Sequence, residues 1–248
     1  MRSSYDSFIE DISNLNSLLD RVEELGSLPQ YLPIKAISSK SAIIMSSGLL
    51  EKYMKESFME FIEKINEMNI PRKYIDEKIW ITNRKNTLKA LEHIDGNKLE
   101  ADYEKVVFVY SASFLKNEKL NKPLLVKEAF SITNANPGPN TVKNMFSNIG
   151  VTKIFQNKYF QWEFGTGTFG DETRVTRTLK SFIELRNWIA HGYSGITIPS
   201  IQEVQEYIKF LEKFVYTTNE ILDQQILIIQ ARHYKDCFNA LDLFCKLD

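Results

Sequence analysis

The sequence predicts an all-α protein, a bundle of long helices that run up and down with short helices and loops inserted between them. Apolar residues recur every three to four positions over several long stretches, which is the spacing of amphipathic helices. Only 10 glycines and 7 prolines occur in 248 residues, below the usual frequencies of roughly 7% and 5%. Sheet proteins need these residues for their many turns, so their scarcity favours helices.

Composition restricts the class of protein. Hydrophobic residues make up 43% and charged residues 25%, which is ordinary for a folded domain and excludes wholesale disorder. The 31 basic and 32 acidic residues give a net charge of −1, which argues against a general nucleic-acid coat protein. With no internal repeat, we expect one domain over residues 1–248, with an N-terminal helix in about 1–30 and an insertion at about 96–170.

The expected location is the cytoplasm, without membrane association. No stretch reaches the 18 or so apolar residues that a membrane-spanning helix needs. The start, MRSSYDSFIED, lacks the apolar core of a signal peptide. Cys237 and Cys245 are the only cysteines and fall on one expected helix, so they imply no disulfide framework.

The first part of the chain predicts three helices. Helical spacing of apolar residues runs from Phe8 to Leu25, and GSLPQYLP then breaks the pattern. Pro33 suits the first turn of a long helix from Ile34 to about Asn69, and a shorter helix follows over roughly Arg72–Ile94. The expected inner face of the long helix consists of Ile37, Ile44, Tyr53, Phe58, Phe61, Ile62 and Ile65.

The middle of the chain is less regular. The stretch Leu99–Leu125 contains VVFVY, which fits a buried helical turn and a short strand equally well. NANPGPN is the clearest loop, and a short helix over Thr141–Asn148 is stopped by Gly150. FGTGTFGDE forms a second expected loop.

Two further helices complete the expected bundle. One runs from about Arg174 to His191 and stops at Gly192. Ser200, followed three residues later by Glu203, forms a capping box that opens a long helix through at least Gln230. Its apolar positions are Val204, Ile208, Leu211, Val215, Ile221, Leu222, Ile226 and Ile229.

The helix before Gly192 carries a cation on its apolar face. At about 100° per residue, one stripe comprises Val175, Leu179, Phe182, Ile183, Ile189 and Ala190. Arg186 falls in the middle of this stripe, where a guanidinium is costly unless it is paired or faces a ligand or a second subunit. A second face gathers Arg177, Lys180, Glu184, Asn187 and His191.

These polar residues also allow a purely structural interpretation. A histidine near the C-terminal end of a helix is favoured by the helix dipole, so Asn187 and His191 can be a polar cap. The interruption of the apolar stripe by Arg186, close to both of them, favours a functional site instead. Asn187 and His191 are four residues apart, so their side chains can meet on one face.

The segment RNWIAHGY resembles the Arg–polar–x3–His motif of the HEPN superfamily, and Tyr193 fits an extended form with a tyrosine two residues after the histidine. SAIIMSSGLLEKYMKESF, NPGPNTVKNMFSNIGVTKIF and the long final helix are also similar to the RiboL-PSP and related bacterial HEPN branches. The resemblance covers about Pro33 to Arg232. The motif stands at the end of the penultimate helix, before a capped long helix, which makes the resemblance specific.

The resemblance implies a HEPN-like bundle that cuts single-stranded RNA with neither a metal ion nor another cofactor. The RNA supplies its own nucleophile, the 2′-hydroxyl. His191 would act as general base or acid, Arg186 would bind the phosphate, and Asn187 would orient His191 or the phosphate. The expected products carry a 2′,3′-cyclic phosphate and a 5′-hydroxyl. Further substrate-binding residues expected on this basis are Arg177, Lys180 and Tyr193.

The resemblance also implies partners. Two copies would dimerise so that their motifs face each other, and such proteins recur in toxin–antitoxin, abortive-infection and anti-phage systems. A nucleotidyltransferase antitoxin that adenylylates Tyr193 is one partner that the extended motif allows. Two alternatives stay open. The chain is a catalytically silent module that binds RNA, a nucleotide or a protein, or it is a structural dimerisation unit.

Other chemistries have little support. His93 and His233 lie on separate expected helices without ligand-like spacing, so no zinc site is expected. GTGTFG lacks the lysine and the Ser/Thr of a phosphate-binding loop, and neither cysteine has a neighbouring base. Aromatic residues that could stack on bases, although most should be core, are Tyr103, Phe108, Tyr110, Tyr159, Phe160 and Trp162.

Overall fold

The computed structural model is an all-α bundle, as the sequence predicts. It describes residues 3–93, 107, 125–131, 136–165, 168–169, 172–193, 195 and 197–244. The helices are α1 (Ser3–Glu23), α2 (Leu32–Glu67), α3 (Glu77–His93), α5 (Pro139–Asn148), α6 (Lys158–Phe164), α7 (Arg174–His191) and α8 (Ile201–Phe244). Single 3-10 turns occur at Pro29–Tyr31, Arg72–Tyr74, Lys127–Phe130 and Ile154–Gln156.

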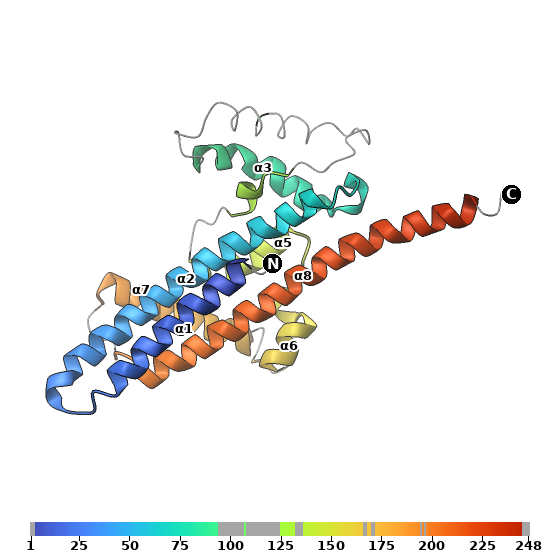
Figure 1. Ribbon diagram of the computed structural model, residues 1–248. Helices are drawn as coiled ribbons and strands as arrows, with labels where there is room; N and C mark the ends of the chain where they lie inside the picture. The colour runs from blue at the N-terminus through green and yellow to red at the C-terminus, as the bar shows by residue number, and fades with distance from the viewer. Residues whose placement is uncertain are drawn as a thin grey trace.

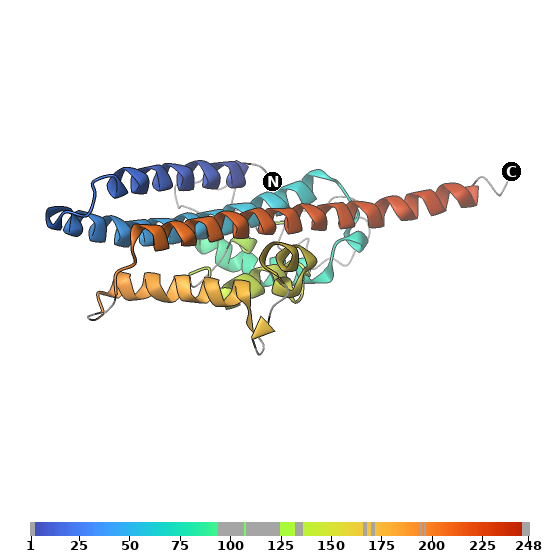
Figure 2. The same ribbon diagram turned by 90° about the horizontal axis from the view of Figure 1, so that it is seen from below.

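The helices form three layers. The long helices α2 and α8 lie side by side in the middle layer and run in the same direction (Figures 1 and 2). The first helix, α1, covers one face of this pair, whereas α5, α6 and α7 lie on the opposite face. The C-terminal part of α8 projects beyond the rest of the bundle. None of the helices in the described part is long and apolar enough to cross a membrane.

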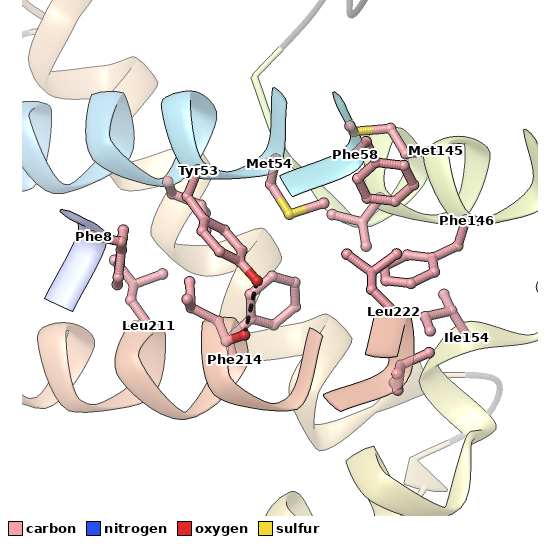
Figure 3. Packing of buried hydrophobic residues seen from close by; sticks show 14 of the residues in the cluster. Phe8, Tyr53, Met54, Phe58, Met145, Phe146, Ile154, Leu211, Phe214 and Leu222 are labelled. Carbon is pink, nitrogen blue, oxygen red and sulfur yellow. Dashed lines mark hydrogen bonds between the residues drawn. The ribbon is translucent and has the colours of Figure 1, made fainter. Parts of the chain in front are cut away.

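The core lies between α1, α2, α8 and the short helices of the third layer. Phe58 of α2 packs edge-on against Phe146 of α5, with ring centroids 5.1 Å apart (Figure 3). Tyr53 is fully buried, and its hydroxyl donates a hydrogen bond of 3.1 Å to the backbone carbonyl of Val215 in α8. All eight apolar positions predicted to be buried in the final helix are buried.

The capping box at the start of α8 is present. The backbone N–H and the hydroxyl of Ser200 both donate to Glu203, at 2.8 and 2.9 Å, and the N–H of Glu203 donates to Ser200 Oγ. These hydrogen bonds favour the charged carboxylate and lower the pKa of Glu203. The box fixes the first turn of the longest helix, and with it the direction in which α8 crosses the bundle.

One prediction about α2 was wrong. Ile37, placed on the inner face, is 65% exposed, and Ile44 is only half-buried. The inner face of this part of α2 is formed by Ala42, Ile43 and Leu50 together with the buried serines Ser39, Ser46 and Ser47. A serine hydroxyl can be buried at little cost when it hydrogen-bonds to its own helix, as that of Ser46 does to the carbonyl of Ala42.

Two other segments differ from expectation, and a third lies almost entirely outside the described residues. Residues Arg72–Tyr74 form a 3-10 turn, and α3 begins only at Glu77, after Asp76 Oδ1 has accepted a hydrogen bond from Lys78 N (2.9 Å). The expected glycine-rich loop contains a two-residue antiparallel ladder, β1 (Thr168–Phe169) with β2 (Glu172–Thr173). Of the segment 99–125, which fitted helix and strand equally, the structure describes only residues 107 and 125.

Candidate functional site

The helix that carries the motif has the bounds that the sequence predicts, because both of its ends are capped locally. Thr173 Oγ1 accepts a hydrogen bond from Thr176 N (3.3 Å) at the start. At the other end Gly192 adopts a left-handed conformation with φ of 66°, and its N–H donates to Ile189 O. A residue with a Cβ is strained in this conformation, so glycine suits the point where α7 stops.

The apolar stripe of α7 is buried only over its first three turns. Val175, Leu179, Phe182 and Ile183 are buried. Ile189 is half-buried and Ala190 is exposed, so the expectation that both lie on the buried stripe was wrong for the last turn. Ile189 still packs against the core, whereas Ala190 is open to solvent, so burial of the stripe decreases along this turn.

Arg186 lies where the buried stripe ends. Its side chain is half-buried, and its Nη1 donates a hydrogen bond of 3.2 Å to Asn187 Oδ1. Its Nε is buried and has no hydrogen-bond partner among the described residues. A buried donor without a partner typically costs about 1–3 kcal/mol, so native proteins rarely keep one without a reason.

A loop from the middle of the chain reaches the motif. Asn136 Nδ2 donates a hydrogen bond of 2.9 Å to Asn187 Oδ1, the same oxygen that accepts from Arg186. Two residues later, the Cβ position of Gly138 lies 4.0 Å from Ile183 Cγ2. Asn136 was not predicted to belong to the site. Its place in the NANPGPN loop was the only feature of the sequence that could have indicated it. It lies 51 residues from Asn187 in the chain.

His191 and Tyr193 form the exposed part of the motif. Both side chains are exposed, Tyr193 to 63%, and their ring centroids are 6.3 Å apart at an angle of 73°. Within the described part of the chain, Asn187 makes its hydrogen bonds to Arg186 and Asn136 and not to His191. The structure therefore gathers two adjacent pairs, Arg186 with Asn187 and His191 with Tyr193.

Arg177 and Lys180 are exposed on the same helix, further from its end. They precede His191 by 14 and 11 residues, which places them roughly 21 and 16 Å away along the helix axis at 1.5 Å per residue. They precede Arg186 by 9 and 6 residues, which is roughly 14 and 9 Å along the same axis.

The chain matches a known protein family. The sequence model of the RiboL-PSP-HEPN family matches residues 6–224. The chain belongs to the RiboL-PSP-HEPN family. No curated protein and no solved structure matches the chain. Membership in a HEPN family is consistent with two kinds of protein, a ribonuclease and a module that binds RNA or a nucleotide.

The HEPN motif does not line the groove between α6, α7 and α8. This groove, of about 710 Å³, lies between α6, α7 and α8 and is bordered on α7 by Arg174, Thr178 and Leu185. Tyr207 lines it as well and packs on Phe182 at a centroid distance of 5.5 Å. Burial raises the pKa of Tyr207. The motif instead occupies an open surface at the end of its helix.

The residues considered for metal binding or for base stacking do not form a second site in the described part of the chain. Among the described residues no group of three His, Cys, Asp or Glu side chains could hold a metal ion. His233 packs edge-on against Tyr74, with ring centroids 5.0 Å apart. Of the aromatic residues considered for base stacking, Phe160 is buried, Tyr159 is half-buried and Trp162 is 90% exposed on α6. Tyr103, Phe108 and Tyr110 lie outside the described residues.

Proposed function

We propose that this protein is a metal-independent endoribonuclease that cleaves single-stranded RNA. The observation that carries the proposal is the state of Arg186, whose Nε is buried without a partner although its Nη1 is held by Asn187. A guanidinium fixed in this way has donors ready for an anion. A phosphate oxygen is the acceptor that its forked geometry fits best.

The proposed chemistry needs one proton acceptor, one proton donor and one cation. The 2′-hydroxyl attacks the neighbouring phosphorus and gives its proton to a histidine, and the bond from phosphorus to the 5′-oxygen breaks. The leaving 5′-oxygen takes a proton from a histidine, and the phosphate closes into a 2′,3′-cyclic diester. His191 serves the proton transfers because an imidazole can both accept and donate a proton. Arg186 offsets the charge that develops on the phosphate oxygens.

A homodimer supplies the second histidine. We propose that two copies meet at the C-terminal halves of their α7 helices, so that each phosphate lies between two motifs. The exposed Trp188, 48% accessible and adjacent to Asn187, supports an interface at this end of α7. Such an interface would also cover the half-buried guanidinium of Arg186, and its attraction to a phosphate is stronger in a less hydrated setting.

We further propose that this ribonuclease acts in the cytoplasm as a toxin or anti-phage effector and that Tyr193 is its control point. The Tyr193 hydroxyl is accessible, and its ring lies beside that of His191. A nucleotidyltransferase antitoxin that adenylylates this hydroxyl would add a phosphate and a base next to His191. The added charge and volume would then exclude the RNA phosphate.

A catalytically silent RNA-binding or nucleotide-binding module is the second candidate. The observation in its favour is that Asn187 Oδ1 is already engaged by two donors, from Arg186 and Asn136, and does not position His191. In this case Arg186, Arg177 and Lys180 would bind phosphates, and His191 would not transfer protons.

The deciding experiment measures cleavage of unstructured RNA oligonucleotides in EDTA, with the product ends mapped. The ribonuclease proposal predicts fragments with 2′,3′-cyclic phosphate and 5′-hydroxyl ends. Oligonucleotides with 2′-deoxy residues at the mapped sites should resist cleavage but still bind. Binding of both oligonucleotides without cleavage of either, at protein concentrations that permit dimerisation, would support the silent module instead.

A further inference from the structure

The loop that carries Asn136 meets the motif helix with a restricted backbone. Asn136 precedes Pro137, which confines the Asn136 backbone to extended conformations. The carbonyl of Asn136 accepts a hydrogen bond of 2.7 Å from Gly138 N, and Pro139 then opens α5. This helix is anchored in the core by three buried side chains, those of Val142, Met145 and Phe146. Few orientations are therefore open to the Asn136 side chain where it contacts α7.

The hydrogen bonds around Asn187 determine which end of each amide faces the other. A guanidinium has N–H donors and no acceptor, so the Asn187 atom that lies 3.2 Å from Arg186 Nη1 must be the oxygen. The same oxygen lies 2.9 Å from the amide of Asn136, which must therefore present its nitrogen. If the Asn187 amide were reversed, its NH2 group would face the donors of Arg186 and the contact would be lost.

This arrangement leaves Asn187 with donors alone for a further ligand. An amide oxygen has two lone pairs, and Arg186 and Asn136 each donate to one of them. The NH2 group is therefore what Asn187 can offer. The half-buried guanidinium of Arg186 likewise can only donate. Two adjacent side chains of the motif thus present donors and no acceptor, which suits the acceptor oxygens of a phosphate.

We propose that Asn136 is a positioning residue of the RNA site. It holds the Asn187 amide so that the NH2 group of Asn187 donates to the phosphate bound by Arg186, and it does not touch the RNA itself. The inference rests on the proposed binding of an RNA phosphate at Arg186, and it assigns Asn187 to the phosphate and not to His191. Without Asn136 the amide of Asn187 keeps one donor and must be ordered when RNA binds, at an entropic cost.

A double-mutant cycle on binding tests the route from Asn136 through Asn187. The probe is a single-stranded RNA oligonucleotide with fluorine in place of every 2′-hydroxyl, so that it cannot be cleaved. Asn187→Ala should raise the dissociation constant at least about tenfold, as loss of a hydrogen bond to a charged group does, and Asn136→Ala about fivefold. The double variant should bind no more weakly than Asn187→Ala alone. Losses that multiply would refute the proposal, because Asn136 would then act by another route.

Asn136→Asp separates positioning from packing. The carboxylate has nearly the shape of the amide but no donor, so it repels the oxygen of Asn187 and competes with the phosphate for Arg186. This variant should therefore bind the probe about tenfold more weakly than Asn136→Ala, although it fills the same space. Asn144→Ala, which is exposed on α5, is the matched control and should bind like the wild type. Wild-type affinity in the Asp variant would refute the positioning role.

The binding cycle is independent of the cleavage test. The probe has no 2′-hydroxyl, so it reports on the phosphate site whether or not the protein cleaves RNA. If the wild type fails to cleave unmodified RNA and the cycle gives the expected result, the ribonuclease proposal is overturned and the role of Asn136 is supported. If the wild type cleaves RNA and the losses multiply, the role of Asn136 is refuted and the ribonuclease proposal is unaffected.

Discussion

Polar atoms are buried in two regions of the molecule, the core between α2 and α8 and the C-terminal half of α7. The two regions differ in the hydrogen-bond partners of these atoms. In the core, the hydroxyl of Tyr53 is fully buried and donates to the carbonyl of Val215. In α7, the Nε of Arg186 is buried and has no partner within the described structure. The core has unpartnered buried atoms of its own, such as Thr218 Oγ1 in α8, but among the described residues only at the end of α7 does such an atom belong to a charged side chain.

This contrast separates stability from function. A satisfied buried hydrogen bond contributes a net of about 1 kcal/mol to folding, whereas an unsatisfied donor costs about 1–3 kcal/mol. Substitutions in the core should therefore change the free energy of unfolding and leave RNA cleavage intact. Substitutions at the end of α7 should do the reverse.

His191→Ala should give the largest effect. The side chain is exposed, so its loss removes a proton-transfer group without opening a cavity. We expect single-turnover cleavage to fall by about two to four powers of ten with the melting temperature unchanged. His233→Ala, which removes a histidine that packs on Tyr74, is the matched control and should cleave at the wild-type rate. Wild-type cleavage by the His191 variant would remove the proposed mechanism.

Arg186→Ala should lower the cleavage rate by about two to three powers of ten, as removal of one transition-state hydrogen-bond donor typically does. Its free energy of unfolding should not fall, because the substitution also removes an unsatisfied donor. Arg186→Lys should be impaired as well, since an ammonium cannot make the forked contact. Arg232→Ala, exposed on α8, controls for loss of a cation. If the Arg186→Ala protein were destabilised but fully active, Arg186 would serve stability and not RNA cleavage.

Tyr193 should give an intermediate effect. Tyr193→Glu places a negative charge next to His191 and should slow cleavage about tenfold, which corresponds to roughly 1.4 kcal/mol of repulsion of the RNA phosphate. Tyr193→Phe keeps the ring and should cleave normally, but it should escape adenylylation by any modifying partner. Full activity of the Glu variant would show that Tyr193 lies off the substrate path.

Tyr53→Phe should give the smallest effect, a loss of about 1 kcal/mol in urea unfolding with cleavage unchanged. Burial raises the pKa of Tyr53 well above the usual tyrosine value near 10. The unfolded chain therefore ionises first, and the free energy of unfolding of the wild type should fall as the pH rises above about 10. The Phe variant should lack this part of the decrease. An identical alkaline decrease in both proteins would assign it to other groups.

The sequence was most informative where structure is decided locally. The ends of α7 depend on Thr173 and Gly192, which act on backbone groups within one turn, and both ends were predicted correctly. The capping box of α8 is equally local. Asn136 could not be found in this way, because its contact with Asn187 exists only after the loop has folded onto α7.

Burial was harder to predict than the helices themselves. Periodicity marked Ile37 as internal, yet the neighbours of α2 contact the face that carries Ser39 and Ser46. Periodicity also extended the buried stripe of α7 to Ala190, which is exposed although Ile189 beside it packs against the core. In both cases the pattern identified a helix, and only the positions of other helices determined which face and which turns were covered.

The serine-lined face of α2 has a consequence for engineering this bundle. Ser39, Ser46, Ser47 and Ser57 each have at most 2% of their surface exposed, so they act as spacers that set how near neighbouring backbones can lie. Exchanging one for valine or leucine would raise hydrophobicity and yet force the layers apart, which typically costs about 1–3 kcal/mol. A redesign that increases the hydrophobicity of the core would therefore destabilise the protein most at these serines. Substitutions that preserve the side-chain volume at these positions should be tolerated.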